Sequence, residues 1–163
     1  MGMKRDAYIE SSVISYLAAR PSKNLVAAAR QRMTWDWWDA RRAEFDLYVS
    51  ELVYTEASDG DPEAADRRLQ YLGQAEVVPV TEEARALARA FLTEGALPEK
   101  AAADALHVAI AAVHGLTYLL TWNCTHLANA EIKPLLRSVC AIHGYTCPEI
   151  CTPEELMGET END

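Results

Sequence analysis

Two acidic residues of this chain lie in surroundings that are unusual for a carboxylate. Glu10 stands between "AYI" and "SSVISYL", and Asp104 stands between "AAA" and "ALHVAIAA". A buried carboxylate needs hydrogen-bond partners or a metal ion, because an unpaired charge is costly to bury. Both are therefore candidate site residues. The structural alternatives are a position beside a helix N-terminus for Glu10 and a bond to a nearby cap or arginine for Asp104.

Other candidates are less distinctive. Asn123 follows the apolar run that opens "LLTWNCTHLAN", although an amide is a poor acid, base or nucleophile. His107 lies three residues after Asp104, which makes the two neighbours on a helix. A histidine satisfied inside the protein is the plainer interpretation of His107. Glu56 follows "SELVYT" and is hard to separate from Glu51, and either residue could be a plain exposed acid.

Alternating strands and helices are expected to position these residues. Strand-like segments are 6–9, 45–50, 76–80 and 117–121; helix-like segments are 11–20, 24–42, 51–57, 62–73, 81–95, 98–115 and 130–144, with a capped turn at 152–157. Ser11 or Ser12 is expected to cap the first helix. The alternation predicts a three-layer α/β/α fold with a mostly parallel sheet of four to five strands. Ligands bind such sheets beyond the carboxyl ends of the strands, where Glu10 and Asn123 fall.

Length and composition predict a single domain. With 163 residues, 50% of them hydrophobic, the chain can bury a sizeable core. We expect the domain to span 1–158 and 159–163 to form a frayed tail. No apolar run is long enough to cross a membrane, and residues 1–10 are too charged for a signal peptide, so a cytoplasmic protein is expected. The four cysteines are then expected to be reduced thiols.

The charge distribution argues against a protein that coats nucleic acids generally. The net charge is −10, made up of +2 in residues 1–50 and −12 in the remainder, whereas phosphate binding depends on basic charge. A local basic patch remains open, with solvated helix faces as the alternative; its members would be Arg20, Lys23, Arg30, Arg32, Arg41 and Arg42.

Four segments, taken in order, resemble the PIN-domain nucleases, and most closely the VapC-like toxins of type II toxin–antitoxin pairs. The segments are "YIESSVISYL", "VSELVYTEAS", "ADALHVAIAA" and "YLLTWN". The resemblance runs from about residue 6 to residue 130. Each segment is weakly specific alone, and their order makes the resemblance fairly specific. It implies a PIN-like domain over 1–158.

The resemblance also implies the site. Glu10, Glu56 and Asp104 match three acids of the family, and Asn123 stands at the fourth acidic position; these four would be the catalytic and metal-binding residues. Ser11, Thr121 and His107 would contact the substrate. Two positions depart from the family pattern, because Glu10 replaces the usual aspartate and Asn123 replaces a carboxylate.

The implied chemistry suits these residue types. Mg²⁺ and Mn²⁺ prefer oxygen ligands, and such ions can activate water and neutralise charge that develops on a phosphate. The resemblance implies RNA as the substrate, a cognate antitoxin as a partner, and a homodimer. An amide at position 123 would weaken a second metal site.

Two further groups of residues allow several interpretations. The spacings of the four cysteines with His126 and His143 are not those of paired zinc knuckles, so buried or partly buried free thiols are the better interpretation. The tryptophans of "WDWW" (Trp35, Trp37 and Trp38) could stack bases or dock an antitoxin helix, with core or dimer packing as the plainest role.

Three functions are compatible with the sequence. The first is a Mg²⁺- or Mn²⁺-dependent ribonuclease toxin. The second is a degenerate PIN domain that binds RNA or protein without cleaving it, a reading that Asn123 and the acidic charge favour. The third is another metal-dependent phosphohydrolase, which is disfavoured because the first strand ends in "IESS" and lacks the D-x-D of a phosphoaspartyl enzyme.

Overall fold

The fold is built on a parallel sheet in the middle of the molecule. The structure is a computed structural model that describes residues 4–159, so the predicted tail lies outside the described residues except for Glu159. Its strands are β1 (Arg5–Ile9), β2 (Phe45–Ser50), β3 (Glu76–Val78), β4 (Tyr118–Leu120) and β5 (Glu149–Cys151). They pair in the order β3-β2-β1-β4-β5, and every pair is parallel.

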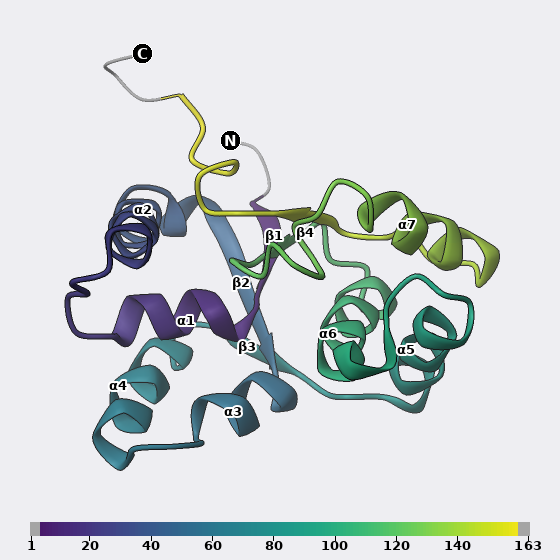
Figure 1. Cartoon of the computed structure of the whole chain (residues 1–163), viewed down its shortest axis with the longest axis horizontal. Helices are drawn as coiled ribbons and strands as arrows, with labels where there is room; N and C mark the ends of the chain where they lie inside the picture. The colour runs from purple at the N-terminus through teal and green to yellow at the C-terminus, as the bar shows by residue number, and fades with distance from the viewer. Residues whose placement is uncertain (1–3, 160–163) are drawn as a thin grey trace.

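Helices cover both faces of this sheet. They are α1 (Ser11–Ala18), α2 (Leu25–Arg41), α3 (Glu51–Ala57), α4 (Pro62–Leu72), α5 (Glu82–Thr93), α6 (Ala102–Val113) and α7 (Lys133–Ile142), with 3₁₀ turns at Arg42–Glu44 and Glu99–Ala101. Figure 1 shows α1 to α4 on one side of the sheet and α5 to α7 on the other. The predicted three-layer α/β/α fold is therefore confirmed.

Side-chain caps explain where most helices begin. Asn24, Ser50, Asp61 and Thr81 each accept a hydrogen bond from a backbone N–H of the helix that follows, which satisfies one of the free donors at the helix N-terminus. The prediction that Ser11 or Ser12 caps the first helix is wrong. Glu10 is the cap, because its carboxylate accepts from the Ser12 N–H.

Two elements differ from the sequence prediction. The expected helix over 98–115 opens as a 3₁₀ turn and becomes α-helical only at Ala102. The strand β5 was missed, since three residues directly after "CP" carry no alternation to detect. The segment 152–157 forms the expected capped turn: the Thr152 hydroxyl accepts from the Glu155 N–H, and the Glu155 carboxylate accepts from the Thr152 N–H.

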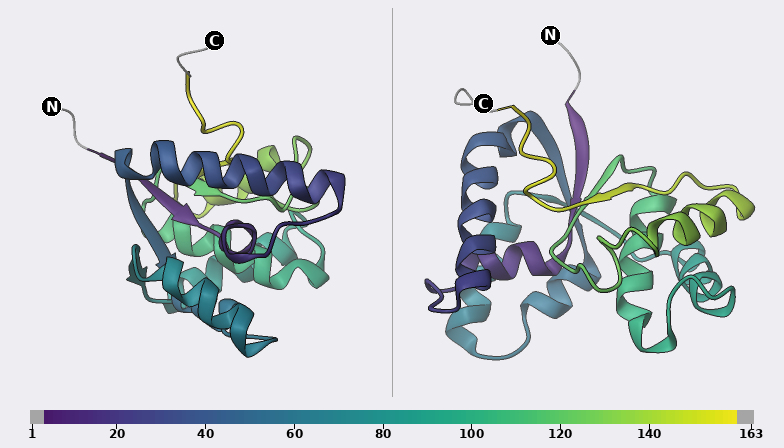
Figure 2. Two further views of the ribbon diagram at one scale, coloured as in Figure 1. Left: turned by 90° about the vertical axis from the view of Figure 1, so that its left-hand side faces the viewer. Right: turned by 45° about the horizontal axis from the view of Figure 1, so that its top comes forward.

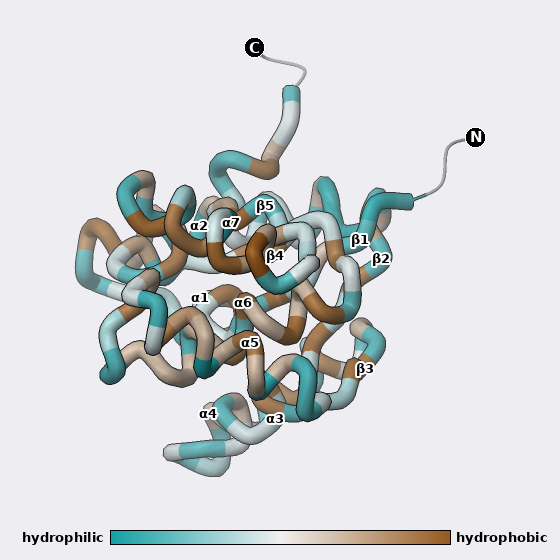
Figure 3. The backbone as a smooth tube through the Cα atoms, turned by 90° about the vertical axis from the view of Figure 1, so that its right-hand side faces the viewer, coloured by the Kyte–Doolittle hydropathy of each residue, from teal (hydrophilic) through white to brown (hydrophobic). Residues whose placement is uncertain are grey.

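The core lies between the sheet and both helix layers. Strand β4 and helix α6 are among the hydrophobic stretches of the chain, as Figure 3 shows. Within the described residues, no helix combines the length and the apolar character needed to cross a lipid bilayer.

The tryptophans of "WDWW" belong to this core. Helix α2 is one long helix that lies against α1 (Figure 2). Trp37 and Trp38 are buried, and Trp35 is partly buried against the same cluster. The indole N–H of Trp37 donates to Leu156 O, and that of Trp35 donates to Leu17 O. Core packing is therefore the role that the structure gives these side chains.

All four cysteines are free thiols. Cys140 and Cys151 are buried and Cys147 is partly buried, as expected, whereas Cys124 is exposed. Burial raises the pKa of Cys151 to about 12, so this thiol stays protonated and unreactive at neutral pH.

We predict that Ile110→Ala destabilises the fold. Ile110 is fully buried in α6, so truncation leaves a cavity and costs about 2–5 kcal/mol of unfolding free energy. The matched control is Ile142→Ala in α7, whose side chain is 72% exposed. Urea unfolding measures both, and equal effects of the two substitutions would contradict this account of the core.

Candidate active site

The candidate site lies at the edge of the sheet where the carboxyl ends of β1, β2 and β4 meet. Glu10 follows β1 directly, and its N–H donates to Leu120 O at 3.0 Å, so the end of β1 is fixed beside the end of β4. Thr121 then follows β4. Ser50 ends β2 and caps α3, the helix that carries Glu56. The expected position beyond the carboxyl ends of the strands is therefore confirmed for Glu10 and for Asn123, which lies three residues after the end of β4.

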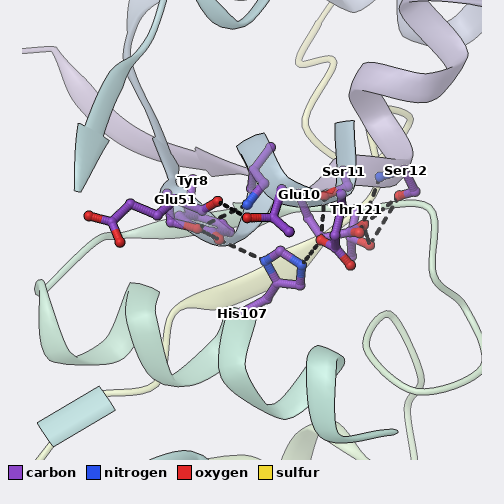
Figure 4. Close-up of polar contacts among 11 residues, drawn as sticks. Tyr8, Glu10, Ser11, Ser12, Glu51, His107 and Thr121 are labelled. Carbon is purple, nitrogen blue, oxygen red and sulfur yellow. Dashed lines mark hydrogen bonds and ion pairs between the residues drawn. The ribbon is translucent and has the colours of Figure 1, made fainter. Parts of the chain in front are cut away.

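Glu10 is held by hydroxyl groups from two segments. Its side chain is buried, with 7% of the residue exposed. One carboxylate oxygen accepts from the hydroxyls of Ser12 and Thr121, both at 2.5 Å, and the other accepts from the Ser12 N–H at 3.1 Å. Figure 4 shows Ser12 and Thr121 beside this carboxylate. Three donors and a helix N-terminus thus satisfy a buried carboxylate without a cation.

The backbone after β4 is fixed to the same hydroxyls. The Trp122 N–H donates to the Ser12 hydroxyl at 2.8 Å, and the Asn123 N–H donates to the Thr121 hydroxyl at 2.9 Å. The Asn123 side-chain oxygen accepts from the His126 N–H at 3.0 Å. Asn123 therefore shapes the turn that follows the strand.

Glu56 belongs to a second network of side chains, which we call the histidine network: Ser11, Glu56, His107, Tyr8 and Ser50. One Glu56 oxygen is 2.6 Å from both the Ser11 hydroxyl and the His107 Nε2. The other ring nitrogen of His107 is 2.7 Å from the Tyr8 hydroxyl, which is 2.8 Å from the Ser50 hydroxyl. Figure 4 shows a hydrogen bond drawn to each nitrogen of the His107 ring.

The pKa values of two members indicate how protons are arranged in this network. Burial would raise the pKa of Glu56, but the hydrogen bond and charge of His107 and the hydrogen bond of Ser11 outweigh it and lower that pKa below its usual 4.5. Burial raises the pKa of Tyr8 far above its usual value, against an opposing hydrogen bond from Ser50, so Tyr8 stays a neutral phenol. An ionised Glu56 needs a donor, so His107 carries its proton on Nε2 toward that carboxylate.

Asp104 has a histidine partner of its own. It lies in the first turn of α6, and its carboxylate is 3.0 Å from the His126 Nδ1. Both side chains are partly buried. His107 lies next to Asp104 along the helix but pairs with Glu56 instead. The two acids are thus held by two different histidines.

The structure distinguishes Glu56 from Glu51. Glu51 is exposed in the first turn of α3, and in Figure 4 its carboxylate points away from His107. Glu56 is partly buried and belongs to the histidine network. His107, expected to contact substrate, is 1% exposed with both ring nitrogens occupied, a geometry that suits holding Glu56 in place.

Sequence reasoning missed four residues of the site. His126 had only a weak signal, its position three residues after the candidate Asn123. Tyr8 and Ser50 had none, since both read as ordinary strand residues. Ser12 was considered only as a helix cap, although its hydroxyl links Glu10 to Trp122.

The donor atoms of this site suit a divalent ion in their chemistry. Carboxylate and amide oxygens are the ligands that Mg²⁺ and Mn²⁺ prefer. However, in residues 4–159 no three His, Cys, Asp or Glu side chains come together as a metal-binding group. Glu10, Glu56 and Asp104 each have a separate set of hydrogen-bond partners.

We predict that Glu56→Gln changes how stability depends on pH. The lowered pKa of Glu56 means that its ionised form favours the folded state; this contribution is present above pH 4.5 and is lost as the pH falls through the folded pKa. Thermal unfolding of Glu56→Gln should therefore lose less stability between pH 4.5 and lower pH than the wild type does. Glu51→Gln is the exposed control from the same helix, and identical pH profiles for Glu56→Gln and wild type would refute the assignment.

Comparisons with solved structures show which proteins share this fold. VapBC2 from Rickettsia felis, bound to a DNA fragment from its promoter, superposes with a TM-score of 0.58 at 12% identity over 90% of this chain and 97% of the other. A toxin–antitoxin complex from Klebsiella pneumoniae gives 0.57 at 17% identity, over 91% and 98%. VapC20 of Mycobacterium tuberculosis, a Sarcin-Ricin loop cleaving toxin, gives 0.54 at 17% identity, over 70% and 87%.

Sequence comparison identifies the family. A search of curated proteins gave no match. The PIN domain matches residues 7–123, a range that covers most of the chain and contains Glu10, Glu56, Asp104 and Asn123. The expected resemblance is thus confirmed, and this chain belongs to the PIN domain family.

Proposed function

We propose that this chain is an endoribonuclease of the VapC toxin type, which hydrolyses RNA phosphodiester bonds and is inhibited by a cognate antitoxin. The observation that carries the proposal is the gathering of Glu10, the histidine network and the Asp104–His126 pair around the carboxyl edge of a PIN fold. One similar structure is a toxin that cleaves the Sarcin-Ricin loop, and two others are toxin–antitoxin assemblies.

The side chains of this chain would orient the reacting groups. Serine and threonine hydroxyls fix the carboxylate of Glu10, and His107 and Ser11 fix that of Glu56. Pre-oriented carboxylates can accept hydrogen bonds from an attacking water and from a substrate hydroxyl, which lowers the entropic part of the barrier. We assign Glu10, Glu56 and Asp104 to this role, with Asn123 as a neutral oxygen donor and Ser11 and Thr121 near the substrate.

A divalent cation, Mg²⁺ or Mn²⁺, is part of the proposal. When bound, such an ion supplies charge neutralisation and an acidified water. The oxygen donors of Glu10, Glu56, Asp104 and Asn123 support this choice of ion. The partnership with an antitoxin and the homodimer also belong to the proposal.

A second candidate function is a PIN domain that binds RNA or protein without cleaving it. Two observations favour it: Asn123 brings no negative charge, and its oxygen is already engaged by the His126 N–H. In that case Glu56 and Asp104 would serve only as partners of their histidines. Cleavage assays on the variants below separate the two functions.

We predict that Asp104→Asn abolishes RNA cleavage. The amide keeps a hydrogen-bond acceptor for His126 but removes the negative charge, so the rate should fall about a hundredfold or more. Cleavage of labelled RNA in Mn²⁺ measures the effect, and circular dichroism checks that the fold is intact. Asp66→Asn, at an exposed position of α4, is the matched control. Unchanged cleavage by Asp104→Asn would eliminate the proposed site.

We also predict that Asn123→Asp tightens Mn²⁺ binding. The substitution preserves the acceptor for the His126 N–H and adds a negative charge beside the other acids. Isothermal titration with Mn²⁺ measures affinity without requiring activity. Asn129→Asp is the matched control, because the Asn129 side-chain oxygen also accepts backbone N–H groups, from Glu131 and Ile132. Unchanged or weaker Mn²⁺ affinity in Asn123→Asp would remove Asn123 from the ligand set.

A further inference from the structure

One stretch of this acidic chain contains basic residues and no acidic ones. Residues 11–35 contain Arg20, Lys23, Arg30 and Arg32 and no Asp or Glu, although the whole chain carries a net charge of −10. The stretch begins at Ser11 in the candidate site, runs through α1, and returns along α2. The stretch therefore connects the candidate site to a segment of the chain that carries only positive charge.

The arginines of the predicted basic patch have different partners in the structure. Three are paired with carboxylates: Arg20 with Glu63, Arg32 with Asp36, and Arg41 with Glu44. Arg42 lies over the ring of Trp38. For Arg30, no carboxylate of residues 4–159 lies within 4.0 Å, so its charge is not neutralised by an ion pair there.

Arg30 contacts two residues of the loop after β4, the loop that also carries Asn123. Its guanidinium carbon lies 5.4 Å from the centre of the Trp122 ring, and one guanidinium nitrogen lies 4.0 Å from the Cys124 sulfur. The Trp122 indole N–H donates to the Thr34 hydroxyl at 2.7 Å, and that hydroxyl donates to Arg30 O at 2.6 Å. The ring and the turn of α2 that carries Arg30 are therefore fixed to each other.

The same tryptophan is connected to Glu10. The Trp122 N–H donates to the Ser12 hydroxyl, which donates to the Glu10 carboxylate. A short series of contacts thus runs from Arg30 through Trp122 and Ser12 to the most buried acid of the site. Because each contact is fixed by a hydrogen bond or by ring stacking, Arg30 keeps a defined place relative to Glu10.

Arginine in this position suits an RNA phosphate. Glu10, Glu56 and Asp104 repel an approaching phosphodiester, and a nearby guanidinium offsets that repulsion. The planar guanidinium matches phosphate oxygens in pairs, and stacking on an indole restricts its orientation before binding. Resting on the proposed ribonuclease function, we propose that Arg30 binds a backbone phosphate of the RNA strand next to the cleaved bond and so positions the substrate.

A protein segment is the competing ligand for this surface. Arg30 lies on a groove of about 570 Å³ whose wall includes the exposed Leu25 and Val26. Glu154 and Glu155 line the same groove. If Arg30 binds an antitoxin segment in this groove and not RNA, replacing Arg30 will leave RNA affinity unchanged. The experiment below therefore separates the two ligands.

The test compares Arg30→Gln with Arg32→Gln, two positions on the same helix. Arg32 is the control because its side chain is 76% exposed and is paired with Asp36. Fluorescence anisotropy with labelled single-stranded RNA, in chelator to prevent metal-dependent cleavage, measures affinity at several salt concentrations. Arg30→Gln should bind roughly tenfold more weakly. The slope of log K against log salt concentration should also become shallower by about 0.7, which is the contribution of one phosphate contact on a single strand.

Each outcome decides one question. Arg32→Gln should match the wild type in affinity and slope, and Arg30→Lys should recover the slope, because it restores the charge. If Arg30→Gln binds RNA with wild-type affinity and slope, the phosphate contact is wrong and the ribonuclease proposal stands. If Arg30→Gln binds RNA as the wild type does but no longer copurifies with a coexpressed antitoxin that the wild type retains, Arg30 is a docking residue and the inference fails. A wild-type chain that binds no RNA even at low salt overturns the proposed function together with this inference.

Discussion

The parallel pairing of β1 with β4 is the constraint on which the candidate site depends. The hydrogen bond from the Glu10 N–H to Leu120 O continues this pairing by one residue beyond the strands. It places the start of α1 beside the start of the loop after β4, so one carboxylate can accept from hydroxyls of both segments. Without this register, Thr121 would not reach Glu10 and the Trp122 N–H would not reach Ser12. The site is therefore a consequence of strand register, with loop conformation adding the finer placement.

The carboxylates of the site are stabilised by different hydrogen-bond partners, and this difference explains why they are buried to different degrees. Glu10 is the most buried and is satisfied by neutral hydroxyl and amide donors. Glu56 and Asp104 are more exposed, and each is next to a histidine. A ring N–H of each histidine can donate a hydrogen bond to its carboxylate. Asn123 supplies an oxygen without another negative charge.

Elements whose structure depends on local sequence patterns could be predicted from the sequence. Contacts between residues far apart in the chain could not. Glu10 and Asp104 could be singled out because acids among apolar residues are rare. Four of the five strands could be expected from short strand-like runs, including the alternation of 45–50 and the β-branched residues of 76–80. The strand β5 could not be found, because three residues owe their extended conformation to pairing with β4. The pairing of His107 with Glu56, rather than with its helical neighbour Asp104, depends on where the fold places α3 and α6 around the end of the sheet and could not be inferred from spacing. His126 lies close to Asn123 in the sequence, but only the folded turn after β4 brings its side chain to Asp104.

The strand order also has a consequence for the time at which the site forms. Strand β1 is synthesised first and lies at the centre of the sheet, but its neighbours β2 and β4 come much later in the chain. The bond between Thr121 and Glu10 closes a separation of 111 residues, and that between Asp104 and His126 also requires the loop after β4. Contacts of such long range form late, because chain closure must precede them. A ribosome making this chain therefore completes about three quarters of it before the candidate site can assemble, so a nascent fragment carries the first acids without their partners from the loop after β4.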